Sequence, residues 1–210
     1  MKPTIDRLIV GDEPEAWAAA GFTVDDDRIC RIGSVRVQLA GRSAGKGMRR
    51  WSLRDADASD EIDGIPTATS AEPAAEGAEH ANGTLRIDHL VLASGDGERT
   101  AAAITAATGL EVLRVRESGT YGSPMVQRFF RLGEVVLELI STAEVIEAPT
   151  RFFGIAVDVD DIDALPGYYG PRIGAVKEAV QPGRRIATLR HKDLDLSVAV
   201  AFMSPGEASA

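Results

Sequence analysis

The sequence predicts an α+β fold in which β-α-β-β-β modules repeat and form a curved mixed sheet, a half-barrel with helices on its outer face. Two repeats and a recurring order of elements predict it. The run Ile5-Asp6-Arg7-Leu8-Ile9-Val10 returns as Ile87-Asp88-His89-Leu90-Val91-Leu92, and the apolar spacing of residues 28–39 returns in residues 128–139. Agreement in two separated blocks indicates copies of one supersecondary unit.

The first full unit follows the order strand, helix and three strands. Its expected elements cover residues 86–93, 98–108, 111–117, 126–132 and 135–141. Asp96 is a suitable N-cap for the helix, and Gly109 is a suitable residue to end it. Gly133-Glu134 supplies the tight turn between the last two strands. Each boundary therefore has its own local signal.

The same order returns in a second full unit and in a compressed N-terminal one. The second unit is expected over residues 152–159, 160–169, 172–180, 184–190 and 196–203, with its helix short or broken at Pro166-Gly167. The N-terminal unit is expected over residues 5–10, 14–20, 22–24, 28–32 and 34–39. A further strand over residues 48–54 is consistent with the start of a truncated fourth unit.

A segment without any large apolar residue separates the two regions. Residues 67–83 consist mainly of Ala, Thr, Ser, Glu, Pro and Gly, and such a segment buries too little surface to offset the entropy of ordering. We therefore expect a degenerate module over residues 1–66, a flexible linker over 67–83, and a domain of two paired modules over 84–206. The paired modules are expected at 84–143 and 151–205.

Composition excludes several classes of protein. The chain has 210 residues and a formal net charge of -9, which disfavours nucleic acid and anionic membranes as partners. Its apolar stretches are strand-sized, far below the roughly 20 residues that span a bilayer. The N-terminus lacks the apolar run of a signal peptide. A single cysteine, Cys30, gives no disulfide framework, so the expected compartment is the cytoplasm.

Paired modules with this pattern resemble the vicinal oxygen chelate superfamily, which includes glyoxalase, bleomycin-resistance and extradiol dioxygenase-like proteins. The resemblance rests on residues 87–92 as a first strand, residues 132–140 as third and fourth strands, and residues 155–163 as the start of the second module. It implies a half-barrel whose concave face holds a divalent metal, with ligands on the first and fourth strands of each module.

The positions that the resemblance marks carry His89 and Glu138 in the first full module. In the second module the same positions carry Gly154 and Ala201, which have no metal-binding side chain, and in the N-terminal copy they carry Arg7 and Gln38. His89 and Glu138 are therefore the candidate catalytic residues and the candidate metal ligands, as an incomplete set. A third ligand would come from another module, a partner chain or His191.

His89 and Glu138 also have ordinary structural interpretations. A histidine on an apolar strand is often a satisfied core or groove residue, and a buried glutamate is often paired with an arginine. Zinc requires three or four protein ligands. We therefore expect no cofactor, with a divalent metal as the alternative.

Other side chains are expected to face or edge the same groove. They are Arg128, Phe130, Phe153 and Arg185, with Tyr121 in a loop at the groove mouth that could act as a lid. Aromatic rings with a few convergent polar groups suit a small organic molecule, and arginine suits a carboxylate or phosphate on it. For each residue, core packing or a solvated rim is the competing interpretation.

Three functions fit these observations. The first is a metal-free, glyoxalase-like protein that binds a small organic molecule, anionic if the arginines contact it. The second is a metal-dependent lyase, isomerase or dioxygenase that uses His89 and Glu138 with ligands from another module or chain, or a metal-free variant of such an enzyme. The third is an interaction role in which the N-terminal module covers the groove. A homodimer is compatible with each of them, because such modules often pair between chains.

Overall fold

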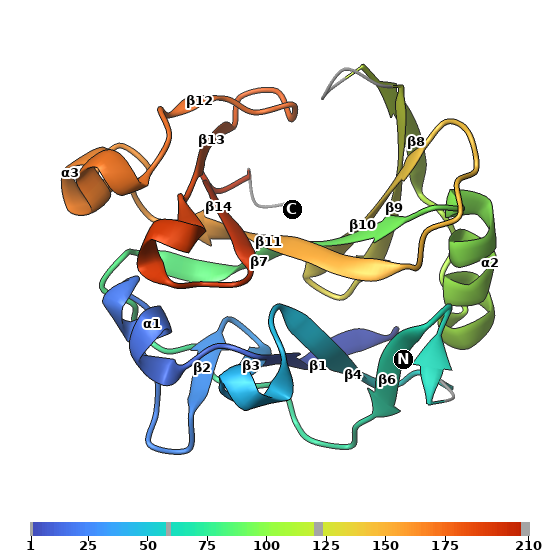
Figure 1. Cartoon of the computed structure of the whole chain (residues 1–210), viewed down its shortest axis with the longest axis horizontal. Coiled ribbons are helices and arrows are strands. Elements are labelled where there is room, and N and C mark those ends of the chain that lie inside the picture. The colour runs from blue at the N-terminus through green and yellow to red at the C-terminus, as the bar shows by residue number, and fades with distance from the viewer. Residues whose placement is uncertain (1, 58–59, 120–123, 207–210) are drawn as a thin grey trace.

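The computed structural model describes residues 2–57, 60–119 and 124–206. The chain forms a six-stranded sheet from its N-terminal part and an eight-stranded sheet from the rest. The larger sheet curls into a half-barrel, and the smaller sheet lies against its outer side (Figure 1). The expected α+β fold of repeated modules with a curved mixed sheet is confirmed.

The N-terminal sheet has the strand order β2-β3-β1-β4-β6-β5. Its elements are β1 (Thr4–Val10), α1 (Pro14–Ala19), β2 (Ile29–Ile32), β3 (Val35–Leu39), β4 (Met48–Arg54), β5 (Glu61–Ile62) and β6 (Ile65–Thr69), with a 3₁₀ turn at Arg42–Ala44. Residues 22–24 form no strand, so this first module lacks the second strand that the repeat predicts.

The C-terminal sheet has the order β12-β13-β14-β11-β7-β10-β9-β8. Its first module contains β7 (Thr84–Ser94), α2 (Gly97–Thr108), β8 (Arg114–Ser118), β9 (Met125–Leu132) and β10 (Val135–Thr142). Its second contains β11 (Arg151–Val159), α3 (Leu165–Tyr169), β12 (Lys177–Glu178), β13 (Arg185–Thr188) and β14 (Ala199–Met203), with 3₁₀ turns at Gly170–Arg172 and His191–Leu194.

Both sheets share one pairing scheme. In the larger sheet β7 and β11 form an antiparallel central pair, flanked in parallel by β10 and β14. In the smaller sheet β1 and β4 form the antiparallel centre, flanked in parallel by β3 and β6. The strand at β4 therefore opens a fourth half-module, reduced to β4, β5 and β6 without a helix.

Local signals set the boundaries of α2. The Asp96 side chain accepts a hydrogen bond from the Arg99 backbone N–H, and Gly109 adopts the left-handed conformation (φ 68°) that ends the helix. Gly133 turns the chain between β9 and β10 with a φ of 64°. The expected strand over residues 172–180 is shorter than predicted, with β12 and one isolated bridge between Ile173 and Leu189. Its residues are mostly exposed at a sheet edge, where packing does not extend the strand.

The segment expected to be a linker begins inside a strand, because residues 67–69 belong to β6. Beyond it, Ala75 and Ala78 donate backbone hydrogen bonds to Ser34 and Arg31. His80 and Asn82 are buried, with 8% and 4% of their surface exposed. The segment is therefore tied to the N-terminal sheet along its length, while its flexibility and the domain division stay predictions.

The two sheets pack back to back. One continuous core contains side chains from both, including Leu8, Trp51, Leu90 and Phe130. The concave face of the C-terminal half-barrel points away from the N-terminal sheet (Figure 1). An N-terminal module that covers the groove, as the third hypothesis expected, is therefore wrong for this structure, because the N-terminal sheet buries its apolar face on the outer side.

Two carboxylates fasten the sheets together. Asp12 accepts hydrogen bonds from the backbone N–H (3.0 Å) and hydroxyl (2.5 Å) of Ser197. Asp63, between β5 and β6, accepts from Arg99 Nε (2.7 Å) and from the hydroxyls of Thr100 (2.5 Å) and Thr150 (2.6 Å). Asp63 is partly buried, and these three bonds link the residue between β5 and β6 to α2 and to the residue before β11.

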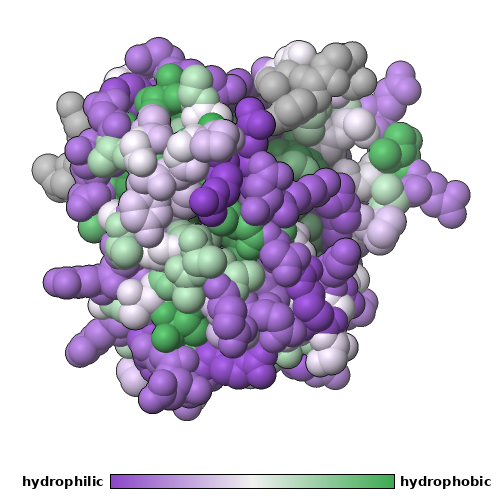
Figure 2. All heavy atoms as spheres, turned by 60° about the vertical axis from the view of Figure 1, so that its left-hand side comes forward, coloured by the Kyte–Doolittle hydropathy of each residue, from purple (hydrophilic) through white to green (hydrophobic). Residues whose placement is uncertain are grey.

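The outer surface is largely polar on the side that carries α1 and α3. There apolar residues occur in small groups among hydrophilic ones (Figure 2). Within the described ranges, no helix has the length and apolar character needed to cross a membrane. A homodimer remains a prediction.

Candidate functional site

A cavity of about 560 Å³ lies on the concave face of the C-terminal sheet. It contains both candidate catalytic residues. Its lining consists of Arg86, Asp88, His89, Leu113, Arg114, Arg116, Phe129, Phe130, Arg131, Val136, Glu138, Val180, Gln181, Arg184 and Gly206. The strands β7, β8, β9 and β10 thus supply most of its wall.

A β-bulge places two consecutive polar side chains in this cavity. His89 pairs with Ala156 and Ile87 pairs with Val157, so Asp88 is an extra residue without a partner of its own in the ladder. In a regular strand, consecutive side chains point to opposite faces. Because of the bulge, both Asp88 and His89 line the groove.

Asp88, His89 and Glu138 form a line of interacting side chains. His89 Nδ1 lies 2.7 Å from Asp88 Oδ2, and His89 Nε2 lies 3.6 Å from Glu138 Oε2. The other Glu138 oxygen accepts a hydrogen bond of 2.5 Å from Gln127 Nε2. With Asp88 as acceptor, a neutral His89 carries its proton on Nδ1 and presents the Nε2 lone pair toward Glu138 and the cavity.

Arg184 extends this line to a buried carboxylate. Its guanidinium donates to Asp88 Oδ1 at 2.7 Å and to Asp158 Oδ1 at 2.5 Å, and Arg86 Nε donates to the second Asp158 oxygen at 2.8 Å. Burial raises the pKa of Asp88, but the hydrogen bonds from His89 and Arg184 outweigh it and hold that pKa below its usual value. Burial and the nearby Asp88 charge raise the pKa of Asp158 above its usual value.

Comparisons with known proteins gave matches to solved structures. Neither a protein-family model nor a curated protein sequence matches the chain. A methylmalonyl-CoA epimerase from Mycobacterium tuberculosis is 16% identical, with a TM-score of 0.48 over 59% of this chain and 90% of that one. A Streptomyces coelicolor methylmalonyl-CoA epimerase in complex with 2-nitronate-propionyl-CoA is 21% identical, with a TM-score of 0.46 over 59% and 99%.

A longer match includes both sheets. A mutant of 4-hydroxymandelate synthase from Streptomyces coelicolor, a vicinal oxygen chelate protein, is 13% identical and superposes with a TM-score of 0.62. The match covers 98% of this chain and 95% of that one. This chain has the vicinal oxygen chelate fold.

Strand register shows which residues occupy equivalent places in the two modules of this vicinal oxygen chelate fold. In the central pair, His89 of β7 lies opposite Ala156 of β11, and Val91 lies opposite Gly154. Exchange of the two strands by the module symmetry relates these two pairs. His89 is then equivalent to Gly154, and Val91 to Ala156. Glu138 pairs with Val91 just as Ala201 pairs with Ala156, so Glu138 is equivalent to Ala201. A Cβ added at Gly154 would lie 2.6 Å from the Ala199 carbonyl oxygen, so this position has no room for a side chain.

These side chains do not fit the metal centre that the vicinal oxygen chelate fold implies. His89 and Glu138 offer two donors, and the equivalent positions of the second module offer none. Within the part of the chain that the structure describes, no three His, Cys, Asp or Glu side chains form a group suited to a metal ion. His191, the sequence candidate for a third ligand, lies in the 3₁₀ turn before β14 and is not among the residues that line the cavity.

The sequence placed several lining residues on the wrong face of a strand. Arg128 is buried on the α2 side of the sheet, where its guanidinium contacts Glu98 and Ser141. Phe130 lies on a strand that borders the cavity, but its ring is fully buried in the core. The expectation that Arg128 faces the groove is corrected, because the period-two alternation of β9 turns Gln127 and Phe129 to that face instead.

The remaining candidates lie outside the cavity. The Arg185 guanidinium pairs with Asp163 at 2.6 Å on the rim, and the adjacent Arg184 is the residue that lines the groove. Phe153 is 46% exposed and does not line this cavity. Tyr121, the expected lid residue, falls outside the described residues. Of the candidates, the structure brings together His89 and Glu138.

Sequence reasoning missed the polar partners of this pair. Asp88 precedes His89 as Asp6 precedes Arg7, so the repeat itself contained a signal for it. Gln127 and Arg184 carry no such signal. They reach Glu138 and Asp88 only because β9 and the residue before β13 border the same concave face.

Proposed function

We propose that the concave groove binds a small organic anion without a resident metal ion. The supporting observation is the composition of its wall. Five arginines line the cavity, at positions 86, 114, 116, 131 and 184, against the two carboxylates of Asp88 and Glu138. This is a local excess of positive charge in a chain whose net charge is -9, and it would attract an anion from solution.

Three of these arginines are available to a ligand. Arg86 and Arg184 are held by Asp158 and Asp88, whereas Arg114 and Arg116 of β8 and Arg131 of β9 form no ion pair with any described residue. A guanidinium matches the geometry of a carboxylate or phosphate and binds it through two parallel hydrogen bonds. The proposed ligand therefore carries such a group toward β8 and β9.

Apolar side chains offer a place for the rest of the ligand. Leu113, Phe129, Val136 and Val180 line the same cavity, and Leu113 and Val180 are 69% and 62% exposed. Exposed apolar surface inside a cavity of this size is typical of small-molecule sites. The ligand class is thus an anion with a compact apolar body.

Titration with a panel of small carboxylates and phosphate monoesters tests this proposal by isothermal calorimetry. We expect a member of the panel to bind, and the double variant Arg116→Gln/Arg131→Gln to bind it at least about tenfold more weakly. Arg185→Gln is the matched control, because Arg185 is paired with Asp163 outside the cavity. Equal weakening by the control, or binding unaffected by the double variant, would exclude the proposed site.

A second candidate function is proton transfer on the bound anion, as in an isomerase or a lyase. The supporting observation is the Asp88–His89 hydrogen bond, which leaves Nε2 as a base 3.6 Å from Glu138. In this mechanism a C–H bond next to the ligand's carbonyl or carboxylate group breaks, the proton goes to His89 Nε2, and the electron pair moves into that group as an enolate. Asp88 stabilises the resulting imidazolium. An isomerase returns a proton to the carbon from His89 or from protonated Glu138, whereas in a lyase the electron pair expels a group on the adjacent carbon.

Deuterium exchange distinguishes the two functions. If His89 removes a proton from the bound ligand, incubation in D₂O places deuterium on the ligand carbon, and His89→Gln reduces that exchange by about 10²-fold or more. Binding without exchange supports the first function alone. Elemental analysis of the protein purified without chelator tests the metal: stoichiometric metal that is lost in both His89→Ala and Glu138→Ala would overturn the metal-free proposal.

The compartment is part of the proposal. Cys30 is a free, buried cysteine, and burial raises the pKa of its thiol far above the usual value, which makes it unreactive. A protein without a disulfide is compatible with a reducing compartment, and we therefore propose the cytoplasm.

A further inference from the structure

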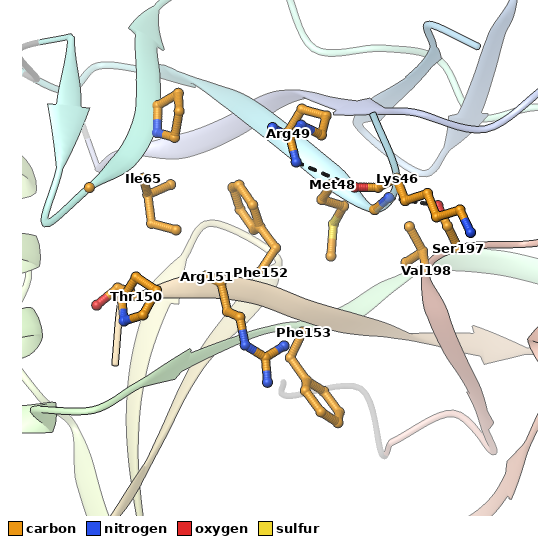
Figure 3. Close-up of a pocket in the computed structure, with 14 residues that line it drawn as sticks. Lys46, Met48, Arg49, Ile65, Thr150, Arg151, Phe152, Phe153, Ser197 and Val198 are labelled. Atoms are coloured by element: carbon orange, nitrogen blue, oxygen red, sulfur yellow. Dashed lines mark hydrogen bonds between the residues drawn. The ribbon is translucent and has the colours of Figure 1, made fainter. Parts of the chain in front are cut away.

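A second cavity of about 610 Å³ lies between the two sheets, away from the groove. It is bordered by β4 and β6 of the N-terminal sheet and by β11 and the residues before β14 of the C-terminal sheet (Figure 3). The lining residues are Lys46, Gly47, Met48, Arg49, Gly64, Ile65, Pro66, Pro149, Thr150, Arg151, Phe152, Phe153, Ser197 and Val198. None of the described groove residues is among them.

One part of the cavity lining is apolar. Figure 3 shows Ile65, Met48, Phe152 and Val198 in the space between β4 and β11. Met48, Ile65 and Val198 are buried, whereas Phe152 is half-buried and packs edge-on against Trp51, with 5.8 Å between the ring centroids. This surface suits an aromatic or branched aliphatic group.

All charged side chains among the described lining residues of this cavity are basic. Lys46, Arg49 and Arg151 are exposed, and among the described lining residues there is no Asp or Glu. The neighbouring carboxylate, Asp63, is engaged by Arg99, Thr100 and Thr150. Lys46 and Arg49 come from the β4 side, whereas the Arg151 side chain extends from β11 away from β4, with its guanidinium 5.8 Å from the centroid of the Phe153 ring (Figure 3).

We propose that this cavity is a second binding site, for an organic anion with a flat apolar body. Lys46 and Arg49 would bind the carboxylate or phosphate, and Met48, Ile65 and Phe152 would contact the apolar body. No Asp or Glu among the described lining residues offsets these cations, so a bound anion would gain their attraction and the burial of its apolar surface.

This site differs from the groove in its consequence for the fold. Its lining comes from both halves of the chain, with Lys46 to Pro66 on one side and Pro149 to Val198 on the other. A ligand there would contact both sheets. If it binds only the folded state, it would raise the free energy of unfolding of the two packed sheets. Binding in the groove would leave the contact between the sheets unchanged.

Calorimetry with 2-naphthoate, 2-naphthyl phosphate and the neutral 2-naphthamide tests the proposal on the full chain. We expect at least one of the two anions to bind at least tenfold more tightly than the amide, and the tighter anion identifies the headgroup. The double variant Lys46→Gln/Arg49→Gln should weaken that anion at least tenfold. Arg50→Gln, on the neighbouring residue of β4 outside the cavity, should leave it unchanged.

Two variants separate this site from the groove. Arg116→Gln/Arg131→Gln should not affect naphthoate or naphthyl phosphate at the second site, whereas loss of binding in that variant would assign the anion to the groove and overturn the proposal. Equal affinity for the amide, or unchanged affinity in Lys46→Gln/Arg49→Gln, would also overturn it. Far-ultraviolet circular dichroism confirms that each variant is folded.

Discussion

The two sheets begin on the same sequence pattern and use it differently. In the N-terminal sheet, Leu53 pairs with Ile5 and Ser52 pairs with Arg7, so Asp6 occupies the same kind of bulge as Asp88. Asp6 is enclosed by Arg36 (2.6 Å), Arg54 (2.9 Å) and the Ser52 hydroxyl (3.0 Å). Asp88 instead lines a cavity beside His89.

The residues after the two bulges show the same contrast. Arg7 donates a hydrogen bond of 2.8 Å to Gln38 Oε1, so these two side chains pair with each other. His89 and Glu138, at the equivalent places, lie 3.6 Å apart and border a cavity. The repeated backbone therefore supplies the same two positions twice. In one sheet their side chains serve stability, and in the other they remain available to a ligand.

Removing one arginine from each network should show this difference most strongly. Arg54→Met leaves the buried Asp6 with Arg36 and Ser52 and also removes hydrogen bonds to backbone carbonyls, so we expect a loss of about 3 kcal/mol in the free energy of unfolding. Arg184→Met should cost less, about 1 to 2 kcal/mol, because Asp158 keeps its bond to Arg86 and Asp88 borders the cavity and can be hydrated. Urea unfolding measures both, and equal losses would contradict the comparison.

Exchanging the residue pairs tests whether the groove chemistry belongs to His89 and Glu138. Placing the N-terminal pair in the groove, as His89→Arg/Glu138→Gln, should preserve the fold but reduce proton exchange on the bound anion by about 10²-fold or more. The reverse exchange, Arg7→His/Gln38→Glu, made in the His89→Arg/Glu138→Gln background, should restore no exchange activity. Restored activity in this combined variant would show that the surrounding cavity is not required.

A single substitution tests the comparison between the two modules of the C-terminal sheet. Ala201 is equivalent to Glu138 by strand register, so Ala201→Glu should add a third donor near His89 and Glu138. We expect the affinity for Mn²⁺ or Zn²⁺ to rise about tenfold, measured by calorimetry. Ala201→Gln is the control of equal size without the charge, and an equal rise in that variant would argue against carboxylate ligation.

The smallest expected effect concerns His80, a buried histidine in residues 67–83, the segment that connects the two sheets along the chain. His80 Nδ1 accepts a hydrogen bond from the Thr23 backbone N–H, and its Nε2 lies 3.1 Å from the Arg31 carbonyl. Burial lowers the pKa of His80 below its usual 6.5, partly offset by the bond to Arg31. The folded protein thus favours neutral His80, and the free energy of unfolding should fall as the pH drops below about 6.5.

His80→Gln should reduce that slope of stability against pH between about pH 7 and pH 5, measured by urea unfolding at each pH. Part of the slope should remain, because burial also lowers the pKa of His191. An unchanged slope would show that His80 is protonated without cost in the folded state.

Strand position was easier to predict than strand face. The β4 segment, the α2 caps and the Gly133 turn follow from local signals, and the structure has each of them. Arg128 and Arg185 were each placed one residue away from the side chain that faces the groove. A strand alternates with period two, so an uncertainty of one residue in register reverses the face of every side chain.

The sequence by itself determined the repeated unit, the fold class and the two positions where one copy carries His89 and Glu138, because apolar periodicity and turn residues act locally. Tertiary structure decided which groups surround that pair. Arg184 and Gln127 reach Asp88 and Glu138 across the sheet, and the cavity between the sheets exists only because the halves pack back to back. Such contacts join residues distant in the chain, and only the closed fold specifies their distance.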